Sequence, residues 1–484
     1  MQRALRGPKR EISGSQKELQ GDMRMRSRFL CLLILLLVAP RLRAQEVPDF
    51  SSLEKTAAEE LAATRTPGAA VAVISGDRIV FSKGFGVANV ETGTPVTPDT
   101  LFHVGSLTKV LTAAAVAAEA EVGRLRLDAP VGGYVLGLAP RIARLTLDQL
   151  LAQTSGLRDV PGEDGLHGED ALGIFVRSLK DDDLLVAPGR AFSYSNAGYA
   201  LAGYVLESAG GKPYADRMDE ILFRPLGMTR TTLRPLMAVT HPLAMGHTAR
   251  GEEAPKVVRP LADDTRLWPA GYAFTSLSDL SRFVLALLNG GKVDSRQALP
   301  PGVAARLLAP HIEIPTNVFV NGAYGYGLFL QDDRGLRRAE HGGELPGYGA
   351  EIRTFPERRV AVIVLANREA VRFNKTFEKA FDLLLGPKPA AASVPSPEPL
   401  PMSPREMTSY AGTYANRWSV DLFVKDGRLV MRRFGTELPV IRIGEHRFSV
   451  TPEGGTPQEF LIVPGANGKP EYLQMFVWIF RKTG

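Results

Sequence analysis

The stretch LFHVGSLTKVLTAAAV, residues 101–116, carries a serine and a lysine three positions apart within an otherwise apolar run. Residues three apart are neighbours on a helix surface, so the pattern predicts that the Lys109 amine lies beside the Ser106 hydroxyl. Because Leu, Val and Ala dominate the stretch, we expect this helix to be buried nearly all round. A buried lysine loses much of its preference for the charged form and can accept the serine proton. The stretch therefore predicts a serine nucleophile that is activated without histidine.

The chain contains a second Ser-x-x-Lys pattern, at Ser52 and Lys55, in different surroundings. Charged residues alternate there with apolar ones, which is typical of an exposed amphipathic helix with a serine near its N-terminal cap. We therefore interpret Ser52 as a capping or surface residue and Ser106 as the nucleophile.

Two further motifs follow Ser106 in the chain. Tyr194-Ser195-Asn196 lies between a Pro-Gly pair and an apolar run, and His341-Gly342-Gly343 lies just before a predicted pair of strands. Taken in order, Ser-x-x-Lys, Tyr-x-Asn and a basic residue followed by x-Gly form the three-part active site of penicillin-recognising serine hydrolases. The chain thus resembles the class C β-lactamase and D-Ala-D-Ala carboxypeptidase-like serine hydrolase superfamily. That superfamily also contains esterases and D-amino-acid-specific peptidases.

The resemblance extends beyond the motifs, over roughly residues 50–386. Further segments similar to the superfamily occur in the expected order, at 145–157, 188–189, 224–228, 270–272, 324–328 and 360–367. Past a proline-rich stretch, Tyr414-Ala415-Asn416 and the terminal Lys482-Thr483-Gly484 repeat the second and third motifs. We interpret both repeats as coincidences within a separate C-terminal domain.

The resemblance implies three catalytic residues. Ser106 would attack a carbonyl carbon to form an acyl-enzyme, while its own backbone N–H would contribute to the oxyanion hole. Lys109 and Tyr194 would share the role of base, and the sequence leaves open which of them takes the first proton. Tyr194 would pass a proton to the leaving group if neighbouring cations lower its pKa.

The resemblance also implies a set of substrate-binding residues. Asn196 would hydrogen-bond a substrate amide, and the backbone N–H of Glu344 would complete the oxyanion hole. Gly342 and Gly343 would leave room for a substrate backbone laid along the strand. β-Lactamases usually carry lysine where this chain has His341, and imidazole is only partly charged near neutral pH. A weaker anchor for a substrate carboxylate favours peptides or esters over β-lactams.

The sequence therefore predicts an exported serine hydrolase for a small-molecule or short-peptide substrate, most consistent with D-amino-acid peptides or small acyl esters. One alternative is a true β-lactamase. Another is a non-catalytic protein that binds peptidoglycan or another ligand on the same fold. The presence of Ser106, Lys109, Tyr194 and His341 together argues against the non-catalytic alternative, because a binding protein needs no complete proton relay.

The order of predicted elements indicates an α+β fold. Helices are expected at 50–64, at several places between 106 and 288, and at 374–385, with strands at 69–74, 78–85, 326–331, 349–354 and 360–365. Strands at both ends indicate one antiparallel sheet flanked by helices, with a mostly helical subdomain inserted between its halves. The resemblance implies the same layout, with the active site in the cleft between the two parts. We assign residues 45–386 to this catalytic domain.

Residues 387–404 contain seven prolines and form a predicted semi-rigid linker. Short strands are expected after it, at 408–414, 419–424, 429–434, 440–443, 448–451, 459–463 and 472–480. Their spacing predicts a small antiparallel β-barrel over residues 405–484, similar to the lipocalin-like domain of some superfamily members. Such a domain either adds stability or shapes the entrance of the cleft.

Residues 1–44 are interpreted as a secretory signal with an N-terminal extension. An apolar core at 29–38 follows several arginines and precedes a Leu-Arg-Ala sequence, which predicts cleavage after Ala44. The core is short for a membrane span, so we expect no stable membrane insertion, although an uncleaved anchor is the alternative. The expected location is the periplasm or the exterior of the cell.

Charge and composition exclude several other functions. Residues 1–44 carry 10 of the 58 Lys and Arg and 3 of the 52 Asp and Glu, so the remainder is nearly neutral and gives no support to nucleic acid binding. The single cysteine, Cys31, lies in the signal core, which leaves the mature chain without a disulfide. The 7 histidines are scattered and form no zinc-binding pattern, so neither a metal nor another cofactor is expected.

Overall fold

The computed structural model describes residues 48–160, 167–249, 253–390, 398–465 and 467–483. The predicted signal segment and its cleavage site at Ala44 lie outside these residues. No helix among the described ranges is both long and apolar enough to cross a bilayer.

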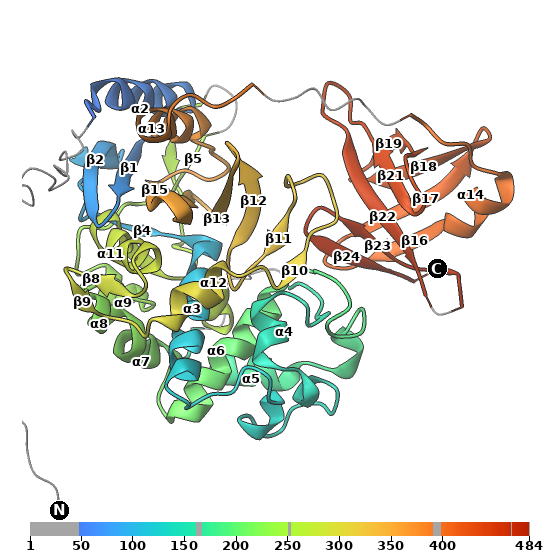
Figure 1. The fold of residues 1–484 in the computed structure, drawn as a ribbon, viewed down its shortest axis with the longest axis horizontal. Coiled ribbons are helices and arrows are strands. Elements are labelled where there is room, and N and C mark those ends of the chain that lie inside the picture. Colours follow the sequence, from blue (N-terminus) through green and yellow to red (C-terminus); the bar gives the residue numbers. More distant parts are fainter. Residues whose placement is uncertain (1–47, 161–166, 250–252, 391–397, 466, 484) are drawn as a thin grey trace, which may run out of the picture. The chain divides into compact units, whose positions relative to one another are not determined.

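A nine-stranded antiparallel sheet forms the centre of the catalytic region, in the order β10-β11-β12-β13-β14-β15-β1-β2-β3 (Figure 1). Its N- and C-terminal halves meet where β1 (Gly68–Ser75) pairs along its whole length with β15 (Val360–Ala366). The remaining strands are β2 (Arg78–Asn89), β3 (Thr94–Pro95), β10 (Ile312–Glu313), β11 (Ala323–Tyr324), β12 (Phe329–Asp333), β13 (Leu336–Leu345) and β14 (Tyr348–Phe355). The expectation of one sheet assembled from both ends of the region is confirmed.

Both faces of the sheet are covered, because successive side chains of a strand point to opposite sides. In β1, Val71 and Val73 face a core shared with α2 (Ser51–Ala63) and α13 (Asn374–Leu385). Ala70, Ala72 and Ile74 face the larger core on the other side, where α11 (Leu277–Leu288) packs on β1 and β15. The continuous apolar sequence of β1 thus reflects burial on both faces.

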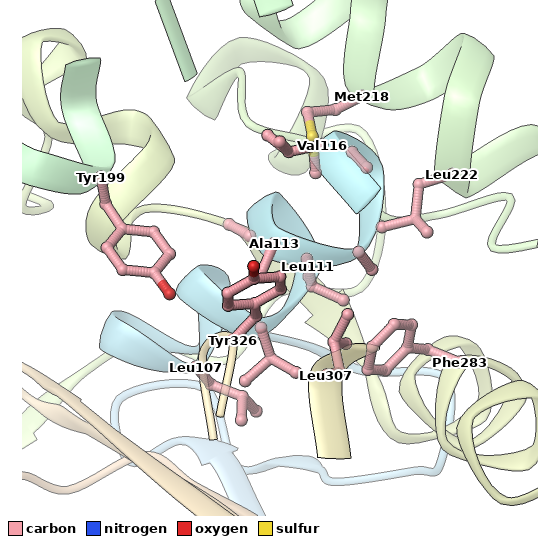
Figure 2. Packing of buried hydrophobic residues seen from close by; sticks show 14 of the residues in the cluster. Leu107, Leu111, Ala113, Val116, Tyr199, Met218, Leu222, Phe283, Leu307 and Tyr326 are labelled. Atoms are coloured by element: carbon pink, nitrogen blue, oxygen red, sulfur yellow. The ribbon is translucent and has the colours of Figure 1, made fainter. Parts of the chain in front are cut away.

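The inserted subdomain is built around α3 (Thr108–Glu121), whose residues from Thr108 to Glu119 are all buried. Figure 2 shows Leu111 and Val116 of this helix packed among side chains from other helices, including Met218 and Leu222. It packs against α6 (Asn196–Gly210), α10 (Trp268–Gly271) and α12 (Gly302–Leu308). The other α-helices described between Leu147 and Ala238 are α4 (Leu147–Leu151), α5 (Ala171–Ser178), α7 (Tyr214–Met218), α8 (Arg224–Leu226) and α9 (Pro235–Ala238). Short strand pairs join β4 (Leu101–His103) to β7 (Phe274–Ser276), β5 (His247–Thr248) to β6 (Lys256–Val257), and β8 (Lys292–Val293) to β9 (Arg296–Gln297).

Two motifs lie close to where the sequence placed them. Ser106 lies at the start of the predicted helix, in a 3₁₀ turn, Gly105–Leu107, and the α-helix begins at Thr108. His341-Gly342-Gly343 precedes the predicted pair of strands, β14 and β15, but itself lies inside β13, a strand that was not predicted. This strand matters for the site, because a strand edge presents backbone N–H and C=O groups to a substrate.

The C-terminal region is a nearly closed, barrel-shaped sheet of nine antiparallel strands, in the order β19-β18-β17-β16-β24-β23-β22-β21-β20. Its strands are β16 (Gly412–Ala415), β17 (Ser419–Lys425), β18 (Arg428–Arg433), β19 (Thr436–Pro439), β20 (Ile441–Arg442), β21 (Arg447–Val450), β22 (Gln458–Pro464), β23 (Pro470–Met475) and β24 (Trp478–Lys482). The edge strands β19 and β20 follow each other at Val440, which brings the two edges of the sheet together. The expected α+β fold with a C-terminal barrel is confirmed.

The sequence prediction misassigned two elements of the barrel. The first predicted strand begins instead as helix α14 (Pro404–Tyr410), which a reciprocal capping box between Ser403 and Glu406 initiates. The last predicted strand, 472–480, is the hairpin β23–β24, and it reverses at Phe476, whose φ is 53°. The tip of this hairpin reaches the active site.

Candidate active site

The nucleophile turn is formed by a close approach of two backbone segments. Gly105 has a φ of 52°, a conformation that side chains disfavour, and a Cβ there would lie 2.5 Å from the backbone nitrogen of Glu344. A Cβ on Gly343 would lie 1.9 Å from the carbonyl oxygen of Val104 and 2.8 Å from the nitrogen of Ser106. Both glycines are therefore required by the contact between this turn and β13. Ser106 lines a cavity of about 880 Å³.

Lys109 is fully buried, and its amine is held by three acceptors. Nζ donates to Ser106 Oγ at 3.1 Å, to Asn196 Oδ1 at 2.7 Å and to the carbonyl oxygen of Ala270 at 2.5 Å. Burial lowers the pKa of Lys109 to about 7, and the negative charge of Asp159 works in the opposite direction. The amine therefore titrates close to neutral pH, as the sequence analysis anticipated for a lysine in an apolar helix.

Tyr194 precedes α6, whose first turn is capped by Ser195 through a 3.2 Å bond from the N–H of Gly198. The nearby Ser106 hydroxyl acts to lower the pKa of Tyr194, and Lys109 Nζ lies 4.7 Å from the centre of the Tyr194 ring. Burial raises the pKa of Tyr194 well above its ordinary value. The condition under which Tyr194 was expected to pass on a proton, a pKa lowered by neighbouring cations, is not met, because desolvation by burial dominates. Tyr194 stays protonated at neutral pH.

The side-chain amide of Asn196 forms hydrogen bonds through both its oxygen and its nitrogen. Besides accepting from Lys109, it donates through Nδ2 to the carbonyl oxygen of Val160 at 3.3 Å. It lines the cavity, so its second amide hydrogen is placed near any bound substrate. Its main role in the free protein is to orient the lysine.

His341 lies in β13 and faces the same cavity while remaining only 2% exposed. Its Nδ1 lies 2.6 Å from the carbonyl oxygen of Gly342, so we assign the ring proton to Nδ1. Burial, with the nearby charge of Lys109, lowers the pKa of His341 to about 3. The expected partial charge at neutral pH is therefore wrong. Nε2 is an acceptor without a hydrogen-bond partner among the described residues.

The edge of β13 is open beside the nucleophile. Strand β12 pairs with β13 only as far as Phe329 opposite Glu340, so residues 341–345 extend past it. On the other side β14 pairs with β13 up to Leu345 opposite Tyr348. The backbone N–H of Glu344 lies beside the nucleophile turn, as an oxyanion-hole donor would. Gly342 has more space than Gly343, since a Cβ there would meet only Arg372 at 3.4 Å and Ala350 at 3.6 Å.

The decoy motifs lie outside the catalytic cluster. Ser52 lies in the first turn of α2, near the surface. The Tyr414 hydroxyl donates to the carbonyl oxygen of Tyr410 within the barrel, and Lys482 Nζ donates to that of Ser409. Asn416 has a different function, because its Oδ1 accepts from the N–H of Asp159 at 3.1 Å and ties the barrel to the catalytic region.

Among the cavity-lining residues that sequence reasoning missed are Asp159, Arg417 and Trp478. Asp159 follows the Thr-Ser-Gly turn, and a carboxylate after a predicted buried turn was an available signal. Arg417 and Trp478 come from the barrel and carry no comparable signal. No group of three or more His, Cys, Asp or Glu within the described ranges is arranged to hold a metal ion.

A partly exposed serine beside a buried lysine and a buried tyrosine, at the junction of an antiparallel sheet and a helical subdomain, is the arrangement of serine hydrolases that recognise penicillin. The chain belongs to the beta-lactamase family, whose model matches residues 53–385. It is 29% identical over 359 residues to penicillin-binding protein 4 of Amycolatopsis lactamdurans, covering 72% of this chain and 93% of that protein. It is 28% identical over 323 residues to Protein flp of Staphylococcus aureus (strain N315), covering 65% of this chain and 62% of that protein.

Two solved structures resemble most of the chain. The crystal structure of SurE superposes with a TM-score of 0.75 and 26% identity, covering 89% of this chain and 98% of SurE. The octameric penicillin-binding protein homologue from Pyrococcus abyssi superposes with a TM-score of 0.63 and 24% identity, covering 90% of this chain and 100% of that one, and shows the fold alone. Both alignments extend beyond the family match, into the C-terminal region.

Proposed function

We propose that the protein is an exported serine hydrolase that forms an acyl-enzyme on Ser106 and prefers D-amino-acid peptides or small acyl esters to β-lactams. The observation that carries this preference is the buried, neutral His341 in the position where β-lactamases usually have lysine. Export to the periplasm or the exterior is part of the proposal and rests on the sequence of residues 1–44.

In the proposed mechanism, neutral Lys109 takes the proton of Ser106 as Oγ attacks the substrate carbonyl. Lysine is the better first base, because burial lowers the pKa of Lys109 to about 7 and raises that of Tyr194. The backbone N–H groups of Ser106 and Glu344 stabilise the oxyanion. Tyr194, still protonated, donates to the leaving group and recovers its proton from Lys109. A water molecule then hydrolyses the acyl-enzyme ester on Ser106, and the proton transfers run in the reverse order.

Substrate preference follows from the hydrogen-bonding capacity of His341. With its proton on Nδ1, the ring leaves Nε2 as a buried acceptor without a partner among the described residues, and in the proposal this atom accepts from an N–H or O–H group of the substrate. A carboxylate offers no donor, so it gains no direct bond there. A charged hydrogen bond is stronger than a neutral one by about 1 kcal/mol, which corresponds to roughly fivefold to tenfold in kcat/KM. Among similar structures, that of SurE was also determined with D-Leu, at 25% identity and a TM-score of 0.73.

The test compares kcat/KM of the wild type for a penicillin, a peptide ending in D-Ala and a neutral nitrophenyl ester. Because the penicillin and the D-Ala peptide both carry a carboxylate, we expect the neutral ester to exceed both, and we expect Ser106→Ala to abolish turnover of all three. His341→Lys should improve the penicillin relative to the ester by about tenfold. A wild type that hydrolyses penicillin best by a wide margin would contradict the preference. If Ser106→Ala retained all three activities, that result would contradict the mechanism.

A further inference from the structure

Asp159 is a buried carboxylate in the active-site cavity that the proposed mechanism does not use. Its side chain is 1% exposed. Oδ1 accepts from the backbone N–H of Asn196 at 2.9 Å, and Oδ2 accepts from Trp478 Nε1 at 3.3 Å. A guanidinium nitrogen of Arg417 lies 3.8 Å from Oδ2, and the N–H of Asp159 itself donates to Asn416. A carboxylate that is buried in the active-site cavity and bound by this many partners is a candidate for a functional role.

The contact with Asn196 connects Asp159 to the base. Asn196 donates its backbone N–H to Asp159 and accepts the Lys109 amine on its side-chain oxygen. Displacement of the carboxylate would therefore displace an acceptor of the lysine. The two groups also interact through charge: Asp159 favours the ammonium form of Lys109, and Lys109 favours the carboxylate form of Asp159. Burial opposes both charges and is the larger effect, because it raises the pKa of Asp159, whereas the bonds from Asn196 and Trp478 and the charge of Arg417 act to lower it. Among the described residues, no hydrogen bond joins Asp159 to Ser106 or to Lys109. Asp159 therefore acts through Asn196 and through the electrostatic effect of its charge.

The barrel supplies the groups that fix Asp159 from the other side. Trp478 is the first residue of β24, next to the hairpin tip, and Arg417 lies between β16 and β17. The same hairpin bonds the segment that carries Tyr194: the Tyr194 N–H donates to the carbonyl oxygen of Val477 at 2.8 Å. A further bond runs from the N–H of Ile479 to the Ser193 hydroxyl at 3.3 Å. One barrel hairpin thus contacts both the tyrosine and the carboxylate.

We propose that Asp159 is a positioning residue that fixes Asn196 and supplies the counter-charge of Lys109, and that the C-terminal barrel holds it there through Trp478 and Arg417. The barrel is then a component of the catalytic centre and more than a stability module. The inference rests on the proposed function, because it assigns Lys109 as the base. The charged or titratable groups that act on the Asp159–Lys109 pair are Arg417 of the barrel, Tyr194 before α6 and His341 of β13.

The main test is the pH dependence of kcat/KM for a neutral ester in Asp159→Asn. Activity requires the neutral amine, so kcat/KM rises with pH through the pKa of Lys109. Asparagine keeps an oxygen for the Asn196 N–H but removes the negative charge that favours the ammonium form. The acid limb of the profile should therefore move to lower pH by about one unit. At pH values below the limb, this shift corresponds to an increase of about tenfold in the fraction of Lys109 that is neutral. An acid limb that coincides with that of the wild type would overturn the inference.

A second pair of variants tests the role of the barrel. Trp478→Phe removes the N–H donor and keeps an aromatic ring, so the carboxylate loses one bond that favours its charge. The acid limb should move in the same direction as in Asp159→Asn, by a smaller amount. Trp418→Phe makes the same substitution in the same barrel, at a ring that packs on Phe434 and Phe480, and should leave the limb unchanged. Indistinguishable profiles for the two tryptophan variants would overturn the assignment of the barrel.

Two controls separate these results from misfolding and from failure of the proposed function. Asp279→Asn alters another buried carboxylate, which accepts from the N–H groups of Arg230 and Thr231 and lies outside the cavity lining. It should lower the melting temperature without moving the limb. A fluorophosphonate should label Ser106 in the wild type. Absence of labelling refutes the proposed function, whereas labelling with an unmoved limb in Asp159→Asn refutes only the counter-charge.

Discussion

Gly343→Ala is the substitution whose consequence the structure determines most directly. The added methyl would lie 1.9 Å from the carbonyl oxygen of Val104 and 2.8 Å from the backbone nitrogen of Ser106. Neither atom belongs to a side chain that can rotate away, so β13 and the nucleophile turn must separate by about 1 Å or more. Overpacking of this kind costs about 1–3 kcal/mol of folding free energy.

The catalytic loss should be larger than the loss of stability. The same displacement moves the two backbone N–H groups assigned to the oxyanion hole, and removal of one such donor costs about 10²–10³ in kcat. We therefore expect Gly343→Ala to lower kcat/KM for a nitrophenyl ester by at least about a hundredfold, while the protein remains folded at 25 °C. The assay is steady-state hydrolysis together with a thermal melt.

The neighbouring glycine provides the matched control. In Gly342→Ala the methyl would meet Arg372 at 3.4 Å and Ala350 at 3.6 Å, which are ordinary contacts. This variant should stay within about threefold of the wild type in kcat/KM. Equal effects of the two substitutions, or a Gly343→Ala enzyme with nearly full activity, would refute the close approach as the source of the oxyanion hole.

Further predictions concern the nucleophile, the base and the N-terminus. Ser106→Ala should abolish ester hydrolysis and fluorophosphonate labelling while Ser52→Ala leaves both near wild type; substantial activity in Ser106→Ala would disprove the assignment. The kcat/KM for a neutral ester should rise with pH through about 7 as Lys109 loses its proton, and a profile flat from pH 5 to 9 would exclude that base. No step from His341 should appear near pH 6.5, because its pKa is about 3. Export should remove residues up to Ala44, and N-terminal sequencing of mature protein that still contains residues before 29 would replace the signal with an anchor.

Much of the fold and the catalytic motifs could be predicted from the sequence because their signals are local. The spacing of Ser106 and Lys109 specifies a shared turn, and the apolar run after them specifies burial. The continuous apolar run of β1 and the amphipathic pattern of α13 gave nearly correct element boundaries. The decoy at Ser52 could be rejected for the same reason, since its charged neighbours predict an exposed helix.

The errors occurred where the local signal was absent or was outweighed. The hairpin β23–β24 turns at Phe476 without glycine, asparagine or proline, so the sequence indicates one continuous strand. Helix α14 carries a capping box at Ser403 and Glu406, but the regular spacing of the short strands after the linker led us to predict a strand from residue 408. The missed turn is the more serious error, because it places Trp478 against the catalytic region.

The contact between Asp159 and Trp478 joins residues 319 positions apart, and only the folded chain brings them together. The same limitation applies to the electrostatics of the site. Burial lowers the pKa of Lys109 and His341 and raises that of Tyr194, so one physical cause favours the neutral form of all three groups. A sequence motif specifies which groups are present but not how much water each one loses. Burial favours the neutral form of Asp159 as well, while the bonds from Asn196 and Trp478 and the charges of Lys109 and Arg417 favour its carboxylate. Two of these groups, Trp478 and Arg417, belong to the barrel, so in the proposal the barrel supports the negative charge of Asp159 and thereby adjusts the strength of the base.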